Sequence, residues 1–447
     1  MELFGTAGIR GPVTEVTPEL AVRVGRAAAT AADGGEFVLA RDGRETGEAL
    51  AAGVASGLLA GGADVRRAGM LPTPALAFAS RGRRGVMVTA SHNPPADNGL
   101  KLFVDGEEYD RDAERAVEDC VDARVADWDQ WGGAERVEVL ERYRRTVVQY
   151  AAGHGADADG LTVAVDCGNG VAGLATPQAL TSAGAEVRAL NATVDGHFPA
   201  RESKPTPESL ADLRAFVADG ADLGVGHDGD ADRVVVVDGD GEVVHEDTVL
   251  AILAEHYTRE SDAADPVVVT TPNASGRVDE RVRAAGGRVE RVRLGALHEG
   301  VASARADGDE GTEVTFAAEP WKHIHPRLGG WIDGVASAAV FARLVAAEGL
   351  DALRAPVTER PYRKESVPCP DERKAAAMAD LEGSLPDVFP EATVDTDHGV
   401  RLDLPDGSWT LVRPSGTEPY VRVYAESEDV DALVATVREH VEAAVQA

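Results

Sequence analysis

The feature that most constrains this fold is a unit that recurs three times: an apolar run, a loop of small or polar residues, and a helical stretch. The apolar runs are Phe37–Ala40, Leu161–Val165 and Pro266–Val269, and the loops that follow them are Arg41–Arg44, Asp166–Gly170 and Thr270–Gly276. Continuous apolar strands that alternate with helices are typical of α/β layers, in which helices cover both faces of a largely parallel sheet. We therefore predict three related α/β domains with mixed, mostly parallel sheets.

The C-terminal segment has a different pattern. After Pro368–Pro370 we expect a helix, then strands at Gly399–Leu404, Trp409–Val412 and Val421–Tyr424. The chain closes with an amphipathic helix whose apolar face carries Leu433, Val434, Val437, Val441 and Val445. This pattern predicts a smaller α+β domain. Because 447 residues are too many for one hydrophobic core, we predict four domains, at residues 1–150, 151–248, 249–362 and 363–447.

The formal net charge of -33 comes from acidic residues spread over the whole chain, and arginine supplies nearly all the positive charge. Such a surplus predicts a protein of a high-salt cytoplasm, where a Debye length of about 3 Å at 1 M salt screens the self-repulsion. It disfavours nucleic acid as a partner, because phosphate backbones bind basic surfaces. A small anionic substrate is repelled as well, so any site for one must be locally positive.

The three cysteines, Cys120, Cys167 and Cys369, are scattered and form no Cys-x-x-Cys pair, which favours a reducing compartment over a zinc or disulfide framework. No apolar run approaches the roughly 18 residues of a membrane span, and no signal-peptide pattern is present at the N-terminus. We expect a cytoplasmic monomer or homodimer without a membrane partner.

Ser91 is a candidate nucleophile or phosphate carrier. The apolar run Val86–Val88 leads into Thr89–Pro94, so a strand delivers Ser91 into a loop rich in turn formers. Alone, this serine could simply cap a turn. A hydrolase nucleophile with His92 as its base is disfavoured, because adjacent residues rarely reach that geometry and no Gly-x-Ser-x-Gly motif is present.

Three alternating carboxylates, Asp228, Asp230 and Asp232, lie between the apolar runs Leu223–Gly226 and Val234–Val237. Oxygen ligands on one tight loop suit Mg²⁺, whereas an acidic surface loop is the alternative. A calcium-binding EF-hand is excluded, because it needs glycine at position six and glutamate at position twelve of its loop. Arg233 and Gly239 stand there instead.

A candidate anion cradle lies near the C-terminus. Guanidinium groups beside a Ser-Gly-Thr turn suit a phosphate that is held rather than attacked, although a plain turn before a strand is the alternative. Its residues are Arg413, Ser415, Gly416, Thr417 and Arg422.

Together these motifs resemble the α-D-phosphohexomutase family (phosphoglucomutase/phosphomannomutase), from Phe4 to the C-terminus. The resemblance implies that Ser91 is phosphorylated and that its phosphate completes the shell of a Mg²⁺ ion held by the three aspartates. Phe4–Gly11 resembles the N-terminal signature of the family, whose arginine, here Arg10, faces the phosphoserine. Arg233 and His92 match family residues near the reacting phosphate. The four predicted domains would then carry the phosphoserine, the metal, the sugar and the distal phosphate, in that order.

The resemblance also names candidates for proton transfer and sugar binding. Lys101 matches a lysine near the transferred proton. Glu319 and His323 match a sugar loop of the pattern Gly-Glu-x-Ser-Gly-His, which implies a sugar-hydroxyl contact for Glu319 and a proton-transfer or orienting role for His323. Trp321 and Lys322 replace the serine and glycine of that pattern. We expect the bulk to leave less room for the O3 and O4 face of a six-carbon ring and the extra cation to alter the hydrogen bonding, so the sugar is left open.

The sequence therefore predicts a Mg²⁺-dependent mutase that moves phosphate between C1 and C6 of a hexose phosphate of the glucose or mannose type, through phospho-Ser91 and a bisphosphorylated intermediate. A phosphopentomutase and a phosphoglucosamine mutase are alternatives within the family. A phosphatase built on the aspartate loop, and a sugar-phosphate sensor without catalysis, are the remaining alternatives.

Overall fold

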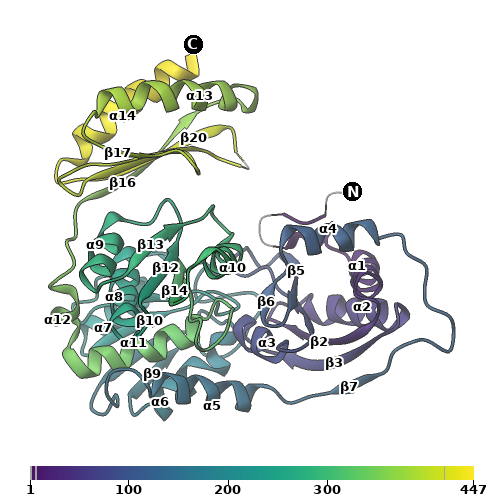
Figure 1. Cartoon of the computed structure of the whole chain (residues 1–447). Coiled ribbons are helices and arrows are strands. Elements are labelled where there is room, and N and C mark those ends of the chain that lie inside the picture. Colours follow the sequence, from purple (N-terminus) through teal and green to yellow (C-terminus); the bar gives the residue numbers. More distant parts are fainter. Residues whose placement is uncertain (1–2, 6–7, 417, 447) are drawn as a thin grey trace. The chain divides into compact units, whose positions relative to one another are not determined.

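The computed structural model describes residues 3–5, 8–416 and 418–446. Within them, helices flank four separate β-sheets, which confirms the predicted mixed α/β chain (Figure 1). The chain forms two compact units, Met1–Glu246 with Trp321–Leu353, and Asp247–Pro320 with Arg354–Ala447. The boundaries of the four domains expected from the sequence remain a prediction. No described helix is both long and apolar enough to cross a membrane.

The first sheet of the first unit has the strand order β1-β5-β4-β2-β3-β7, with β6 paired to β5. Strands β4, β2, β3 and β7 run parallel, and β5 is antiparallel to both of its neighbours on that path. The strands are β1 (Ile9–Pro12), β2 (Gly35–Arg41), β3 (Ala63–Met70), β4 (Arg84–Val88), β5 (Asp97–Val104), β6 (Glu107–Glu108) and β7 (Ala134–Arg136). The helices around it are α1 (Pro18–Ala31), α2 (Gly47–Ala60), α3 (Thr73–Ala79) and α4 (Arg111–Asp119).

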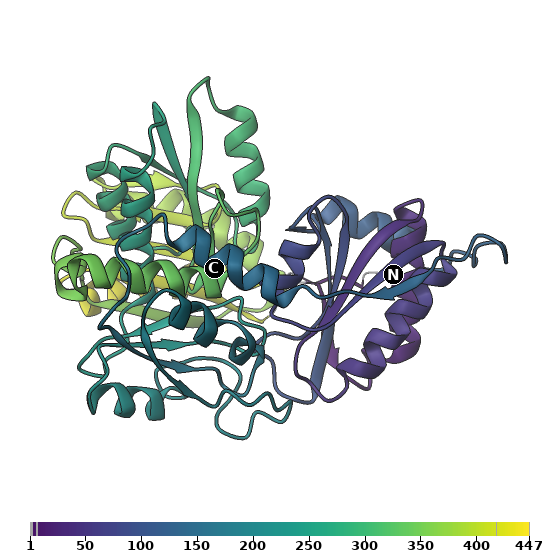
Figure 2. The ribbon, with the colours of Figure 1, turned by 90° about the horizontal axis from the view of Figure 1, so that it is seen from below.

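Helices α1 and α2 lie side by side on one face of this sheet, where they build its core (Figures 1 and 2). Glycines allow the two helices to approach closely, since a Cβ atom at Gly57 would lie 2.1 Å from the carbonyl oxygen of Val22. Because β2 and β4 are parallel neighbours, the loops after their carboxyl ends lie together. The Asp42 amide indeed donates to the Val88 carbonyl at 3.0 Å. This edge of the sheet positions Ser91.

The second sheet of this unit has the order β11-β10-β8-β9, in which β8, β9 and β10 are parallel and β11 is antiparallel. The aspartate loop connects β10 to β11. The strands are β8 (Thr162–Asp166), β9 (Glu186–Leu190), β10 (Leu223–Gly226) and β11 (Val235–Val237). The other elements of this part are α5 (Leu140–Ala151), the 3-10 helix Val171–Leu174, α6 (Thr176–Ser182), α7 (Ala211–Ala218), β15 (Lys322–Ile324) and α11 (Gly334–Glu348), followed by α12 (Leu350–Arg354).

The second unit contains an α/β part and a C-terminal α+β part. In the first, β12 pairs in parallel with β13 and β14. Its elements are α8 (Glu246–Arg259), β12 (Asp265–Thr270), α9 (Gly276–Ala284), β13 (Arg288–Arg291), α10 (Leu297–Asp307) and β14 (Thr312–Glu319). The second has the wholly antiparallel order β16-β20-β19-β18-β17. Its elements are β16 (Tyr362–Pro368), α13 (Asp371–Val388), β17 (Thr393–Asp395), β18 (Val400–Asp403), β19 (Trp409–Pro414), β20 (Tyr420–Glu426) and α14 (Val430–Gln446).

Helices α13 and α14 cover one face of the C-terminal sheet (Figure 1). The predicted apolar face of the closing helix is confirmed, because Leu433, Val434, Val437 and Val441 are buried in this core and Val445 packs against it.

Candidate active site

Ser91 lies in the loop after β4 with an unusual backbone conformation. Its φ angle is 51°, in the left-handed region that side chains other than glycine rarely adopt. The Ser91 amide donates to Thr89 Oγ1 at 2.9 Å, and the residue is only 1% exposed. A strained conformation persists only where the surroundings hold it, so this loop is fixed by its neighbours.

The aspartate loop lies directly against Ser91. Ser91 Oγ donates to Asp228 Oδ2 at 2.8 Å, and each of the three aspartates offers an oxygen within 4.8 Å of the others. All three are buried, and burial together with the charges of Asp232 and Asp230 raises the pKa of Asp228 well above its usual value. The structure thus brings together the two motifs that the sequence singled out.

A divalent cation fits this cluster. Asp230 Oδ1 and Asp232 Oδ1 are buried and accept no hydrogen bond from any described residue. The second carboxylate oxygen of each of these two aspartates contacts a residue outside the aspartate loop. Thr73 Oγ1 donates to Asp230 Oδ2 at 2.6 Å, and Lys101 Nζ contacts Asp232 Oδ2 at 3.1 Å. Unpaired carboxylate oxygens on one buried loop suit a hard cation such as Mg²⁺.

Two half-buried arginines add positive charge beside Ser91 and the aspartate loop. Arg233 Nε lies 3.7 Å from Asp228 Oδ2, and Arg10 pairs through its backbone with Gly99 on the neighbouring strand. Gly99 leaves room for Arg10, because a Cβ atom there would lie 2.9 Å from Arg10 Cγ. Among the described residues, the Nε atoms of both arginines are buried without a hydrogen-bond partner. An anionic phosphoryl group would supply that partner.

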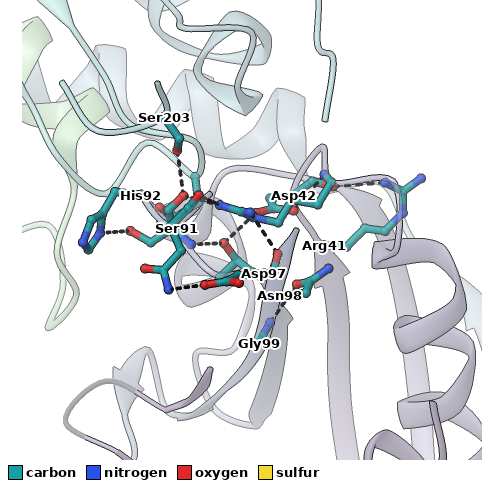
Figure 3. Close-up of polar contacts among 12 residues, drawn as sticks. Arg41, Asp42, Ser91, His92, Asp97, Asn98, Gly99 and Ser203 are labelled. Carbon is teal, nitrogen blue, oxygen red and sulfur yellow. Dashed lines mark hydrogen bonds and ion pairs between the residues drawn. The ribbon is translucent and has the colours of Figure 1, made fainter. Parts of the chain in front are cut away.

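His92 and Lys101 have opposite protonation states. His92 Nδ1 lies 3.3 Å from Ser91 Oγ (Figure 3), and burial, with the charges of Arg233 and Arg10, lowers the pKa of His92 to about 3. Its imidazole is therefore neutral at pH 7. Burial alone would lower the pKa of Lys101, but Glu108 and Asp232 outweigh it and hold that pKa above the usual value. Lys101 is charged.

Arg44 holds the Ser91 loop in place through hydrogen bonds. Its side chain is fully buried, and the guanidinium donates to the carbonyls of Ser91, Asn93, Pro94 and Asp97 and to the Asp42 carboxylate, at 2.5–3.1 Å. Burial raises the pKa of Asp42 to about 6, although the Arg44 charge opposes this, so Asp42 is ionised at neutral pH. The Ser91 carbonyl accepts a second bond, from Ser203 Oγ at 2.9 Å (Figure 3).

The predicted sugar loop has a different geometry from the one expected. Trp321 has a φ angle of 70°, and its side chain packs against the core of the second sheet, which includes Val235 and Val237. Trp321 is half-buried there, and the expectation that its bulk narrows the sugar site stays a prediction. Lys322 forms a β-bridge with Arg233 and, with other cations, keeps the pKa of Asp232 below its usual range against the effect of burial.

His323 and Glu319 lie on either side of this turn. His323 is 1% exposed, and its Nδ1 contacts Ser337 Oγ of α11 at 3.0 Å. Burial lowers the pKa of His323 to about 3, so its imidazole is neutral. Glu319 ends β14 and belongs to the second compact unit.

The candidate phosphate loop has a cross-strand arginine pair at its base. Arg413 on β19 and Arg422 on β20 occupy directly paired positions. Like charges at paired positions repel, so the pair is suited to an anion. The Ser415 amide donates to the Tyr420 carbonyl, and Lys374 Nζ holds the loop from behind by donating to the Ser415 carbonyl at 2.6 Å. Gly416 is exposed, and Thr417 lies outside the described residues.

Several supporting residues were missed from the sequence. They are Asp42, Arg44, Thr73, Glu108, Ser203 and Lys374. Asp42 and Arg44 lie in one of the three loops that follow apolar strands. This position could have identified them as candidates, because loops at the carboxyl ends of parallel strands often form ligand-binding sites.

Comparisons with known proteins find relatives over nearly the whole chain. Family profiles described as phosphoglucomutase/phosphomannomutase match three parts of the chain, with α/β/α domain I at residues 1–126, α/β/α domain II at 141–241 and the C-terminal domain at 366–444. A phosphopentomutase of Thermococcus kodakarensis is 42% identical over 440 residues, 96% of this chain and 94% of that protein. A probable phosphoglucosamine mutase of Methanopyrus kandleri is also 42% identical, over 95% of this chain and 94% of its own.

Among solved structures, a phosphoglucomutase/phosphomannomutase family protein of Burkholderia thailandensis is similar throughout, with a TM-score of 0.86 and 27% identity. The similarity covers 99% of this chain and 97% of that one. The chain therefore belongs to the phosphoglucomutase/phosphomannomutase family of phosphosugar mutases.

Proposed function

We propose that this chain is a Mg²⁺-dependent sugar-phosphate mutase that carries the migrating phosphoryl group on Ser91. The observation that carries the proposal is the 2.8 Å contact between Ser91 Oγ and Asp228 Oδ2 within a buried trio of aspartates. Phosphoryl transfer asks a protein mainly for positioning and for neutralisation of charge. Asp228, Asp230 and Asp232 would hold the Mg²⁺ ion, which would offset the negative charge that develops during the transfer.

The residues divide the work as follows. The Oγ–P bond of phospho-Ser91 breaks as the free hydroxyl of a sugar monophosphate bonds to the phosphorus, which gives a bisphosphate. The sugar then turns, and Ser91 Oγ bonds to the phosphorus of its other phosphoryl group. The bond between that phosphorus and the sugar oxygen breaks, and the oxygen takes up a proton, which regenerates phospho-Ser91 and gives the isomeric monophosphate. Arg10 and Arg233 face the migrating group, while Arg413 and Arg422 hold the distal phosphate. Neutral His92 can accept the hydroxyl proton and charged Lys101 can donate one, with His323 as a further candidate.

A phosphopentose is the substrate that we propose first. A relative named phosphopentomutase is 42% identical over nearly the whole chain. Trp321 and Lys322 distinguish the sugar loop, and Lys322 lies close enough to Asp232 to help lower the pKa of that carboxyl. A cation there suits phosphate and neutral hydroxyls better than the protonated amine of glucosamine phosphate.

Glucosamine phosphate is the second candidate, because a relative of equal identity is named a probable phosphoglucosamine mutase. Glucose phosphate and mannose phosphate, the substrates that the sequence predicted first, are the remaining candidates.

The experiment is a substrate panel of ribose 1-phosphate, glucosamine 1-phosphate, glucose 1-phosphate and mannose 1-phosphate, assayed with Mg²⁺ at low salt and in molar KCl. We expect the highest kcat/KM for ribose 1-phosphate and no release of free phosphate. Lys322→Gly, which restores the family residue, should raise the relative kcat/KM for glucosamine 1-phosphate about tenfold. Free phosphate as the main product would favour the phosphatase, and a preference for any hexose would refute the pentose proposal.

A further inference from the structure

A second hollow of the first unit is separate from the residues of the candidate active site. It has a volume of about 370 Å³ and lies over the part of the first sheet formed by β2, β3 and β7, beside α2. This volume lies within the range of small-molecule sites, roughly 300–1,000 Å³. Neither Ser91 nor any of the three aspartates lines it.

The floor of this hollow is open because its residues are small. Ala40, Ala51, Ala52, Ala68 and Gly69 line it. Ala68 is an extra residue in β3, since Leu39 pairs with Arg67 while the next residue, Ala40, pairs with Gly69. Such a bulge re-aims the neighbouring side chains. A Cβ atom at Gly69 would meet nothing within 4 Å.

The rim carries two arginines at paired positions of neighbouring strands, which are parallel here and antiparallel in the candidate phosphate loop. Arg67 on β3 and Arg136 on β7 are directly paired positions of neighbouring strands, as Arg413 and Arg422 are in the C-terminal sheet. Within the described part of the chain, neither Arg67 nor Arg136 forms an ion pair. In a chain with 77 acidic and 44 basic residues, two adjacent arginines without an ion pair are unexpected.

Some of the other charged side chains that line the hollow already have polar partners. Arg41 Nη2 contacts Glu48 Oε2 at 3.0 Å, and Arg41 Nη1 donates to the Asp42 carbonyl at 3.0 Å. Glu138 is the other carboxylate of the wall and is exposed. Carboxylates accept hydrogen bonds from hydroxyl groups, whereas paired guanidinium groups bind phosphate.

We propose that this hollow binds the phosphate group of a small phosphorylated, hydroxylated molecule, with Arg67 and Arg136 as its anion ligands and Glu138 facing the hydroxyls. The site lies outside the mutase centre and does not depend on the proposed mutase reaction. Its ligand class is a phosphate monoester.

The test is protection of individual arginines from phenylglyoxal, read by peptide mass spectrometry on the full chain. The probes are inorganic phosphate and ribose 5-phosphate, with KCl of equal ionic strength and free ribose as controls. Arg124, an exposed arginine of the same unit, is the internal control. We expect both probes to slow the modification of Arg67 and Arg136 while Arg124 reacts unchanged.

Calorimetry provides the second measurement. In an Arg10→Gln/Arg233→Gln/Arg413→Gln/Arg422→Gln background, which removes the candidate phosphate contacts of the mutase centre and of the distal loop, phosphate should still bind once. Adding Arg67→Gln and Arg136→Gln should lower that affinity at least about tenfold, without changing the melting temperature. Equal protection of Arg124, protection by KCl alone, or binding that survives the added substitutions would each overturn the proposal.

Discussion

Replacing Arg44 by lysine tests whether this residue positions the phosphate carrier. The guanidinium of Arg44 makes five hydrogen bonds, four of them to backbone carbonyls of the Ser91 loop. A lysine keeps the positive charge against the buried Asp42 but offers at most three donors from a single point. At least two of the five bonds are therefore lost in Arg44→Lys.

The structure sets the size of the effect. A hydrogen bond to a charged group contributes about 1.5–3 kcal/mol, so the loss of two costs about 3–6 kcal/mol of unfolding free energy. A released Ser91 loop also displaces Oγ from Asp228, and a misplacement of about 1 Å costs about 100-fold in rate. We expect kcat to fall about 10- to 100-fold while KM changes little, because the distal phosphate is held elsewhere.

Arg343→Lys is the matched control. Arg343 is also buried, and it donates to the His154 carbonyl at 2.8 Å and pairs with Asp157 at 2.7 Å, away from Ser91. Both variants should lose melting temperature. Only Arg44→Lys should lose kcat and the phosphoryl group that intact mass detects on Ser91 after incubation with a sugar bisphosphate.

Rescue separates positioning from folding. Added methylguanidinium should restore part of the kcat of Arg44→Ala, because it supplies the missing guanidinium group. It should leave the kcat of Arg343→Ala unchanged. If both lysine variants lost similar stability and both kept kcat within about twofold of the parent, Arg44 would be a structural residue only and the reasoning would fail.

Three further outcomes are expected. Ser91→Ala should retain the fold but abolish turnover and the added phosphoryl mass, and any remaining mutase activity would exclude Ser91 as the carrier. Thr73→Val removes the 2.6 Å bond to Asp230 Oδ2, so the Mg²⁺ concentration for half-maximal activity should rise about 10- to 100-fold; an unchanged value would deny Thr73 this role. Burial lowers the pKa of His256 from 6.5 to about 4, so this residue contributes stability above pH 6.5 that is lost as the pH falls towards 4. His256→Gln should therefore remove about 2 kcal/mol of the loss in unfolding free energy between pH 7 and 4.5, and an unchanged pH profile in chemical unfolding would contradict this.

The sequence was sufficient to predict that Ser91 and the aspartate loop lie together. Both follow apolar strands, and both match motifs of one family over the whole chain. The strands themselves were located within a residue or two, as for Phe37–Ala40 within Gly35–Arg41, because continuous apolar runs define buried strands. Chemistry that lies on a short loop at a strand end can thus be predicted from residue types and spacing.

The supporting contacts could not be predicted in this way. Arg44 binds carbonyls about fifty residues away, and backbone carbonyls leave no mark in the residue types of a sequence. Trp321 shows the same limit, because the residue type indicates a bulky side chain but neither the positive φ angle of its backbone nor the core cluster against which the indole packs. The group that such a side chain contacts depends on how the loops fold in three dimensions, and the pattern of residue types along the sequence does not specify this.

The acidic surplus of this chain makes its unpaired arginines informative. Most arginines have carboxylate partners close at hand, as in the pairs Arg281–Glu255 and Arg291–Asp279. Where carboxylates are abundant, two adjacent arginines that form no ion pair must have been kept apart from them by the fold. Such arginines repel each other across the strands, and an anion bound between them offsets this repulsion. Arg67 and Arg136 form no ion pair with a described residue, whereas Arg422 of the candidate phosphate loop contacts Glu418 Oε2 at 3.4 Å, so of the two pairs the one at Arg67 has more need of an anion.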